Sequence, residues 1–362
     1  MMCSYFSLNG TSLCANDYML RTILRGAWNR SDAVVMSDCG AVGNMILNGE
    51  AIDEEDASAK ALNGGMDLYA GEADNFWHDG YLAKAVNDSL TTEALVDEAL
   101  ARAMLAIMRT GAFDPIDGQP YVNLTVANGV NTSLHQQVAF EAALQSLVLL
   151  KNSNATLPLK RGVRMAVLGP LSSVTTRLAS DYAEADYCAY NDSGTWCRDG
   201  FTVQKDPTNV DRACCLSGAS IAAGLAAANS GGVTHQADGV LVSGGNLSDV
   251  PAAIALIKNA DVVVMVLGDT TAEEDEGADR SNTLLPGNQA FFGRQVLNAS
   301  AAAGVPVVLI LVNGGAISID PLLTFPAPSA VIEAFKPVVQ GPRAIAETIF
   351  GDHNRFGKLP VT

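Results

Sequence analysis

The chain has 362 residues, of which 48% are apolar and only 17% charged, a balance that gives sizeable buried cores and room for two domains. The formal net charge of -17 and the lack of any basic cluster exclude nucleic acid as a partner. The longest apolar runs, 261–268 and 304–315, are too short to span a bilayer and are bounded by turn residues, so we expect buried parallel strands and no membrane partner.

Short apolar strands alternate with helical segments over residues 1–110. Strands are predicted at 2–6, 33–37 and 66–70, and helices at about 16–28, 54–64 and 91–111. Thr91 or Thr92 can cap the last helix, whose apolar face is predicted to include Leu95, Ala99, Met104, Ile107 and Met108. This repeating βα pattern predicts a parallel sheet. Three units cannot close an eight-unit barrel of roughly 250 residues, so most of such a barrel would have to lie upstream.

Residues 111–134 hold two prolines and several Gly and Asn without apolar periodicity, and we predict a linker there. Residues 135–362 form a second α/β region, with a helix from 135 into a turn and strands predicted at 163–169, 261–267, 305–311 and 330–335. Further helices are predicted at 217–229, 249–260, about 288–304 and 341–350. This pattern predicts a mostly parallel sheet with helices on both faces and functional loops at the carboxyl ends of the strands.

The glycosylation sequons and the cysteines indicate in which cellular compartment the protein is found. The first ten residues show no signal peptide, yet nine Asn-x-Ser/Thr sequons favour a secreted, glycosylated protein: Asn9, Asn29, Asn87, Asn123, Asn131, Asn154, Asn191, Asn246 and Asn298. Seven cysteines are not a disulfide framework, and an odd number leaves at least one thiol free. Their one cluster, where one or two bridges would fit an oxidising compartment, is Cys188, Cys197, Cys214 and Cys215.

Two acidic features follow predicted strands. Asp38 comes directly after the apolar residues 33–36, where it either caps the next helix or is held there to react. Residues 272–280, AEEDEGADR, follow the strand at 261–267. Crowded carboxylates raise one another's pKa, so these loops fit general acid/base chemistry on a glycosidic bond. Spacing alone favours the simpler interpretation of a solvated acidic loop and a helix cap.

Five segments in order resemble landmarks of glycoside hydrolase family 3, which holds β-glucosidases and β-xylosidases: 2–16, 34–45, 140–159, 276–289 and 350–362. Their joint order along nearly the whole chain is far more specific than any one of them. The resemblance implies that residues 1–110 are the C-terminal part of a (β/α)8 TIM barrel, and that 135–362 form an α/β sandwich domain with a mostly parallel sheet.

The resemblance also implies roles for individual residues. The family's Ser-Asp strand end, which supplies the nucleophile, matches Ser37 and Asp38. The glutamate of its Glu-Gly-x-Asp-Arg pattern, which serves as acid/base, matches Glu276, with Glu274 as the alternative on the same loop. Tyr5 matches a tyrosine that lines the sugar subsite; the contrary interpretation is a buried core tyrosine.

Other matches and departures qualify the resemblance. Cys39 stands where most β-glucosidases of the family carry Trp, and Ser-Asp-Cys resembles the β-xylosidase and arabinofuranosidase branch. Asp67 matches a landmark at the next strand end and either holds a loop or touches substrate, while Asp279 and Arg280 are predicted to form an ion pair that fixes the Glu276 loop. The family's Lys-His pair, which grips the sugar, is absent.

The sequence therefore predicts an exo-acting retaining β-glycosidase, β-xylosidase-like or β-glucosidase-like, acting on oligosaccharides or aryl glycosides, with impaired activity in this chain. A non-catalytic carbohydrate-binding or regulatory remnant of the same fold is the alternative. Possible partners are the missing N-terminal barrel segment or further copies of the chain. No cofactor is implied, and no metal site is expected, because the four histidines are isolated: His78, His135, His235 and His353.

Overall fold

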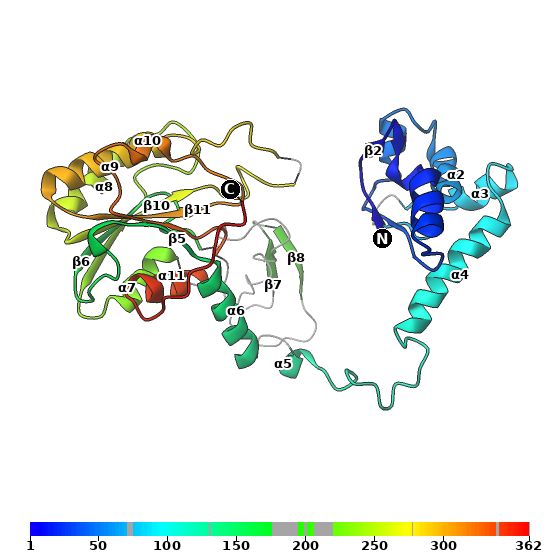
Figure 1. Cartoon of the computed structure of the whole chain (residues 1–362), viewed down its shortest axis with the longest axis horizontal. Helices are drawn as coiled ribbons and strands as arrows, with labels where there is room; N and C mark the ends of the chain where they lie inside the picture. The colour runs from blue at the N-terminus through cyan, green and yellow to red at the C-terminus, as the bar shows by residue number, and fades with distance from the viewer. Residues whose placement is uncertain are drawn as a thin grey trace. The chain divides into compact units, whose positions relative to one another are not determined.

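The computed structural model describes residues 1–70, 75–129, 132–175, 220–276, 278–337 and 340–361, together with the backbone of two short strands, β7 (Thr195–Arg198) and β8 (Phe201–Lys205). The chain divides into two compact units, Met1–Leu124 and Thr125–Thr362 (Figure 1). The dividing point lies within the range 111–134.

The second unit is built on a six-stranded sheet in the order β5-β12-β11-β10-β6-β9. Its strands are β5 (Val148–Asn152), β6 (Arg164–Leu168), β9 (Val233–Ala237), β10 (Val262–Gly268), β11 (Val307–Val312) and β12 (Ala330–Glu333). All neighbours pair in parallel except β5, which runs antiparallel to β12 at one edge. The mostly parallel sheet predicted from the apolar runs is confirmed.

Helices cover both faces of this sheet. They are α6 (Ser133–Ser146), α7 (Ile221–Ala228), α8 (Val250–Ala255), α9 (Gln289–Ala303), α10 (Asp320–Leu323) and α11 (Gly341–Ile349), with short helical turns α5 (Val126–Gly129), η3 (Ser153–Ala155) and η5 (Leu256–Asn259). Figure 1 shows α8, α9 and α10 on one face of the sheet and α7 and α11 on the other.

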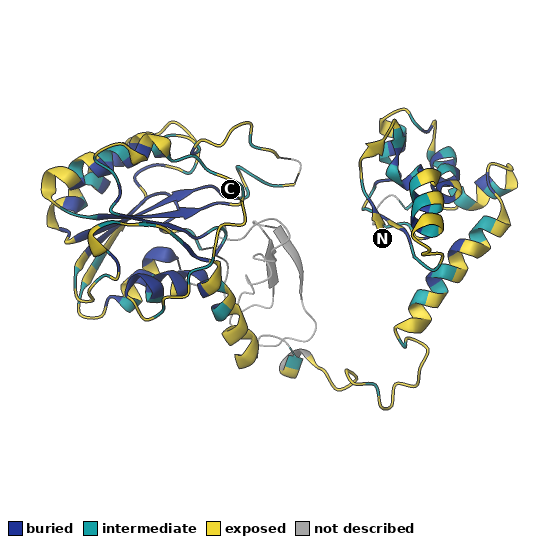
Figure 2. Cartoon of the chain, viewed as in Figure 1, coloured by how far each residue is buried: buried dark blue, intermediate teal, exposed yellow. Residues whose placement is uncertain are grey.

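The continuous apolar run of β10 is explained by these two helical layers. Val264 and Val266 pack toward α7 and α11, whereas Met265 and Leu267 pack toward α9, and all four are buried (Figure 2). Each fully buried side chain of this kind contributes roughly 1.5–3 kcal/mol. A strand buried on both faces has no polar side, which is why its sequence does not alternate.

Two strands of this sheet and one short helix were not predicted. The helix predicted from residue 135 ends at Ser146 and is followed by β5 rather than by a turn. Both β5 and β9 are edge strands with exposed or half-exposed positions, so they lack the apolar run that reveals the central strands. The short helix α10 was also missed.

The first unit holds three predicted βα units, with shorter strands than expected. β1 (Met2–Cys3) pairs in parallel with β4 (Met36–Ser37), and the predicted strand at 66–70 is reduced to one parallel bridge, Met36 to Leu68. A small hairpin joins β2 (Ser7–Leu8) to β3 (Thr11–Ser12). The helices are η1 (Leu13–Ala15), the π-helix η2 (Tyr18–Ala27), α1 (Asn44–Leu47), α2 (Glu54–Gly64), α3 (Tyr81–Asn87) and α4 (Glu93–Arg109).

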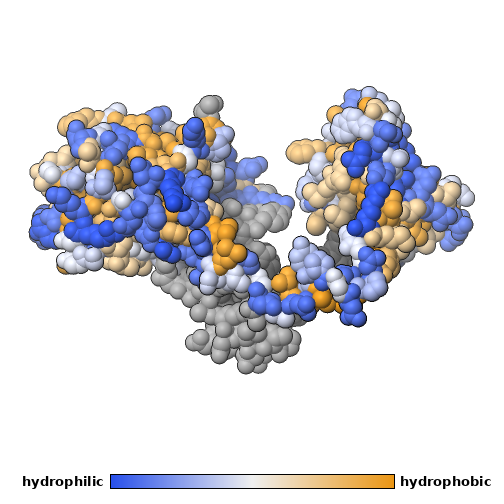
Figure 3. All heavy atoms as spheres, turned by 60° about the horizontal axis from the view of Figure 1, so that its bottom comes forward, coloured by the Kyte–Doolittle hydropathy of each residue, from blue (hydrophilic) through white to orange (hydrophobic). Residues whose placement is uncertain are grey.

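Helix α4 begins as predicted, because the Thr92 hydroxyl accepts a hydrogen bond from the Leu95 amide. Its apolar face is only partly as predicted. Ala99 is buried, but Ile107 is 42% exposed and Met108 58% exposed. Figure 3 shows hydrophobic residues at the surface of both units and of the segment that joins them.

The structure joins Cys3 to Cys14 in a disulfide across eleven residues, a pairing that the sequence analysis did not predict, and leaves Cys39 as a free, exposed thiol. The predicted bridges at Cys188, Cys214 and Cys215 lie outside the described residues, as does the side chain of Cys197. Among the described helices, none combines the length and the apolar content needed to cross a bilayer.

Candidate active site

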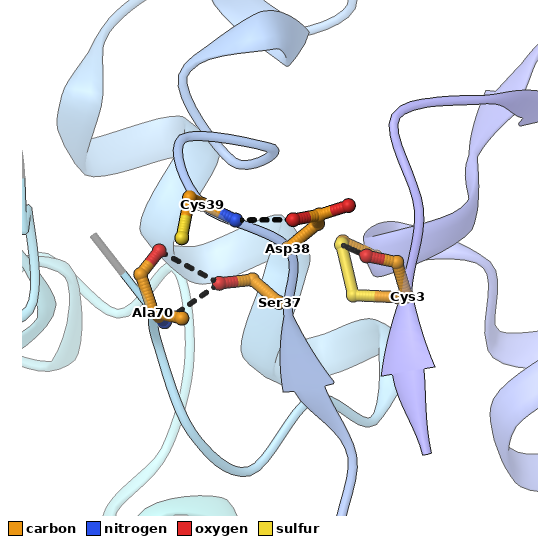
Figure 4. Close-up of a disulfide and its surroundings, with 6 residues drawn as sticks. Cys3, Ser37, Asp38, Cys39 and Ala70 are labelled. Carbon is orange, nitrogen blue, oxygen red and sulfur yellow. Dashed lines mark hydrogen bonds between the residues drawn. A yellow bond between two sulfur atoms is a disulfide. The ribbon is translucent and has the colours of Figure 1, made fainter. Parts of the chain in front are cut away.

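Asp38 lies at the carboxyl end of β4, held by its backbone and by one carboxylate oxygen. Its amide donates to the Cys3 carbonyl at 2.9 Å. Its Oδ1 accepts from the Cys39 amide at 2.8 Å, as Figure 4 shows. The carboxylate is half-buried, and its Oδ2 has no hydrogen-bond partner within the part of the chain that the structure describes. The alternative of a helix cap is excluded, because α1 begins after Gly43 with no side-chain cap.

The neighbouring serine fixes the strand end on the other side. Ser37 is fully buried, and its hydroxyl donates to the Ala70 carbonyl at 3.2 Å and accepts from the Ala70 amide at 2.7 Å (Figure 4). These two bonds join the end of β4 to the backbone of Ala70. The backbone that carries Asp38 is therefore held by Cys3 on one side and by Ala70 on the other.

Tyr5 lies beside this strand end. Its hydroxyl donates to the Cys39 carbonyl at 2.9 Å, and the residue is 39% exposed. The contrary interpretation, a buried core tyrosine, is therefore wrong. The ring is accessible next to the peptide that follows Asp38.

Asp67 has a structural role in this unit. It is buried, and its Oδ2 accepts from Arg25 at 2.7 Å and from the Val35 amide at 2.8 Å. Its Oδ1 accepts from Arg102 at 2.8 Å. Because both oxygens bind groups of the fold, Asp67 holds α4 and η2 against the strand, which resolves the two alternatives in favour of the structural one.

The carboxylates of the acidic loop after β10 differ in their contacts. Glu273 accepts from the Thr270 amide at 3.0 Å and from the Ser243 hydroxyl at 2.8 Å. Glu274 accepts from the Gly315 amide at 3.1 Å. Both carboxylates therefore support the loop.

Glu276 lies in a turn of the same loop. Asp275 and Ala278 exchange backbone hydrogen bonds, which places Glu276 between them in a tight turn, and Glu276 is exposed. The Glu276 amide donates to the Asp275 carboxylate at 2.8 Å.

Arg280 fixes this loop, but its partner is not the one predicted. Its guanidinium donates to Asp269 at 3.0 Å and lies 3.8 Å from Glu274, whereas the exposed Asp279 makes no ion pair with it in the described residues. Asp269 was missed by the sequence analysis. The available signal was its position directly after a buried strand, where parallel strands bring polar residues to one edge.

Glu333, at the end of β12, is the most perturbed carboxyl of this edge. Burial raises its pKa to about 7, and the Asp269 charge adds to that rise, while hydrogen bonds from the Phe335 amide and Asn313 oppose it. No group of three or more His, Cys, Asp or Glu side chains in the described residues could hold a metal ion.

The fold and the two strand ends define an α/β protein in which the last part of a βα barrel precedes an α/β sandwich domain. Residues 1–106 match the Glycosyl hydrolase family 3 N terminal domain, and residues 147–362 match the Glycosyl hydrolase family 3 C-terminal domain. The chain therefore belongs to glycosyl hydrolase family 3, as the resemblance implied.

Several named proteins are similar over the whole chain. Beta-D-xylosidase 1 of Arabidopsis thaliana is 35% identical over 366 residues, and Beta-xylosidase/alpha-L-arabinofuranosidase 2 of Medicago sativa subsp. varia is 32% identical; each match covers 100% of this chain and 42% of the relative. Among solved structures, a GH3 exo-beta-xylosidase (XlnD) in complex with a xylobiose aziridine probe superposes with a TM-score of 0.78 at 29% identity, covering 97% of this chain and 41% of that one. The chain thus spans less than half the length of these relatives.

Proposed function

We propose that this protein hydrolyses terminal non-reducing β-linked sugars by a retaining double displacement. The observation that carries the proposal is the Asp38 carboxylate, which stands at a strand end with one oxygen that has no hydrogen-bond partner in the described residues. Asp67, the other aspartate at a strand end of this unit, has both oxygens engaged. A carboxylate oxygen that has no hydrogen-bond partner in the described residues is available to react.

In the first step, an oxygen of Asp38 forms a bond to the anomeric carbon as the bond to the leaving group breaks, and the Glu276 carboxyl gives its proton to the departing oxygen. In the second step, water attacks the anomeric carbon, its proton passes to the Glu276 carboxylate, and the ester bond to Asp38 breaks. The mechanism requires the two carboxyl groups to come within about 5 to 5.5 Å of each other in the active protein.

Exposure supports Glu276 rather than Glu274 as acid/base. Glu274 is half-buried, accepts from the Gly315 amide and lies 3.8 Å from Arg280, so its carboxylate supports the loop. Glu276 is exposed at the turn. For Tyr5, exposure beside Asp38 supports contact with the sugar.

The substrate class follows from the relatives. Both plant relatives carry xylosidase names, and the superposed structure is an exo-beta-xylosidase. We therefore propose a β-xyloside ahead of a β-glucoside. The Cys3–Cys14 disulfide and the exposure of the described sequon asparagines support a secreted glycoprotein.

A second candidate is a non-catalytic carbohydrate-binding remnant, favoured by two observations. The described strands of the first unit are only two residues long, and the chain spans 42% of its relatives. A nucleophile without the rest of its barrel loses the orientation on which catalysis depends.

A mechanism-based fluoro-xyloside that traps the glycosyl-enzyme separates the two candidates. The reagent is incubated with this chain and with a version extended upstream in its gene, and peptides are read by mass spectrometry. We expect the label on Asp38 in the extended version and none on the short chain. Asp38→Asn should abolish the label, whereas Asp88→Asn, an exposed carboxylate of the same unit, should leave it unchanged. An extended version that carries no label on Asp38 would overturn the catalytic proposal in favour of the remnant.

A further inference from the structure

A buried charge cluster lies where β10 and β12 end, behind the acidic loop. Asp269 follows β10 and is fully buried. Its Oδ1 accepts from Lys336 at 2.5 Å, and its Oδ2 accepts from Arg280 at 3.0 Å. A buried carboxylate between two cations is held firmly, because losing any partner leaves an uncompensated buried charge.

The chain after β12 is bent so that Lys336 reaches this carboxylate. Phe335 has a φ of +51°, in the left-handed region, and its amide donates to the Glu333 carboxyl at 2.8 Å. The Lys336 ammonium then donates to the Asp269 carbonyl at 2.8 Å as well as to its side chain. The ends of two strands are thereby tied to the start of the loop.

The same cluster ties the other arm of the loop. Arg280 donates to the Leu284 carbonyl and lies 3.8 Å from Glu274, whose carboxylate accepts from the Gly315 amide. The Gly314 amide donates to Asp269 at 3.3 Å. Glu274 precedes Glu276 in the sequence and Arg280 follows it. The hydrogen bonds above therefore anchor the loop to the carboxyl edge of the sheet on both sides of Glu276.

We propose that Asp269 is a positioning residue: through Arg280 and Lys336 it sets the conformation of residues 270–276 and 278–284 and hence the place of Glu276. This inference rests on the proposed function of Glu276 as acid/base. The described part of the loop has no helix and only two isolated bridges, Asp275 to Ala278 and Leu284 to Ser318, so side-chain contacts contribute much of what holds its shape. A general acid displaced by about 1 Å loses much of its effect on the reaction rate. The Asp269 cluster therefore influences the rate through the position of Glu276.

The first test measures the loop in this chain, by amide hydrogen exchange of residues 270–284. Asp269→Asn should speed exchange there by at least about tenfold, because two buried cations lose their partner. Arg280→Lys keeps the charge but not the forked contact with Asp269 and Leu284, and should give a smaller increase in the same peptides. Asn229→Ala is the matched control. Asn229 is buried near the amino ends of β6 and β9, where its side-chain amide donates hydrogen bonds to the Val163 carbonyl and the Thr234 hydroxyl. Asn229→Ala should destabilise the second unit without a selective increase in exchange within the loop. If Asp269→Asn leaves the exchange rates of the loop equal to those of the parent, the proposal is overturned.

The second test measures proton donation in the upstream-extended version by comparing one aryl xyloside with one alkyl xyloside. A dinitrophenyl leaving group needs no proton, whereas a methyl leaving group does, so a displaced acid slows the first step only for the methyl xyloside, and kcat/KM reports that step. Asp269→Asn and Arg280→Lys should lower kcat/KM for the methyl xyloside by about tenfold or more relative to the dinitrophenyl one, and Asn229→Ala should leave the ratio unchanged. If Glu276→Gln itself leaves the ratio unchanged, the acid/base proposal fails. If Glu276→Gln changes the ratio and Asp269→Asn does not, only the positioning proposal is overturned.

Discussion

At the scale of single residues, the contacts of a carboxylate distinguish a structural acid from a reactive one. Asp67 and Asp269 are both buried, and each forms ion pairs with two cationic side chains of the fold. Their charges therefore stabilise the structure. Asp38 is half-buried and accepts from one backbone amide. All three follow or adjoin strands, and the sequence pattern alone does not separate them.

Glu333 predicts a pH dependence of stability. Its pKa is raised from 4.5 to about 7 by burial, so the folded state binds a proton that the unfolded state has lost between those values. Its contribution is therefore fully present below pH 4.5 and is lost as the pH rises through 7, by about 3 kcal/mol in total. Glu333→Gln keeps an acceptor for the Phe335 amide and should remove this dependence.

Urea unfolding of the second unit from pH 4 to 9 checks this expectation. The free energy of unfolding of the parent should fall across the window relative to Glu333→Gln, and the half-exposed Glu141→Gln should follow the parent. Parallel curves for the parent and Glu333→Gln would contradict the assignment of a buried, protonated carboxyl.

At the scale of elements, two strands meet so closely that only glycine fits. Gly268 ends β10 with a φ of +147°, and a Cβ there would lie 1.7 Å from the Val312 carbonyl oxygen of β11. Asp269 follows directly, so this close approach also sets where the charge cluster begins.

Gly268→Ala should therefore destabilise the second unit by more than about 3 kcal/mol, from the clash and the strained φ together. Gly304→Ala, at the left-handed end of α9 with open space around it, should cost only about 1 kcal/mol. Chemical denaturation of both variants measures the difference. Equal losses would show that the strands can separate to admit a methyl group.

Elements also differ in how far they could be predicted. β10 and β11 were predicted because a strand buried on both faces is apolar throughout. β5 and β9 were missed because an edge strand keeps polar positions. In α4, Ile107 and Met108 follow a helical period that predicts burial, yet they are 42% and 58% exposed.

At the scale of the whole molecule, this exposed surface predicts how the chain behaves. Large apolar side chains are exposed along the first unit, among them Phe6, Trp28, Leu47, Ile52, Ile107 and Met108. Exposed patches of this kind mark surfaces that another segment covers. Because the chain spans 42% of its relatives, we expect residues outside it to cover them.

The dye ANS, which becomes fluorescent on exposed apolar surface, should bind this chain at least roughly twice as strongly per mole as the upstream-extended version. In the short chain, Met108→Gln should lower the signal, and Leu323→Gln, on α10 of the second unit, should lower it equally in both versions. Equal dye binding by the two versions would show that the upstream residues do not cover the first unit.

By itself, the sequence determined the α/β class, the central strands, the cap of α4, and the ordered landmarks that point to Asp38 and Glu276. These features are local: they follow from periodicity, from residue type at a strand end, and from short motifs. Only the tertiary structure decided that Asp67 is structural, that Cys3 pairs with Cys14, and that Arg280 binds Asp269 rather than its neighbour Asp279. The physical reason is that a hydrogen bond or an ion pair depends on distances in space, and residues 269, 280 and 336 meet because parallel strands end at one edge of a sheet.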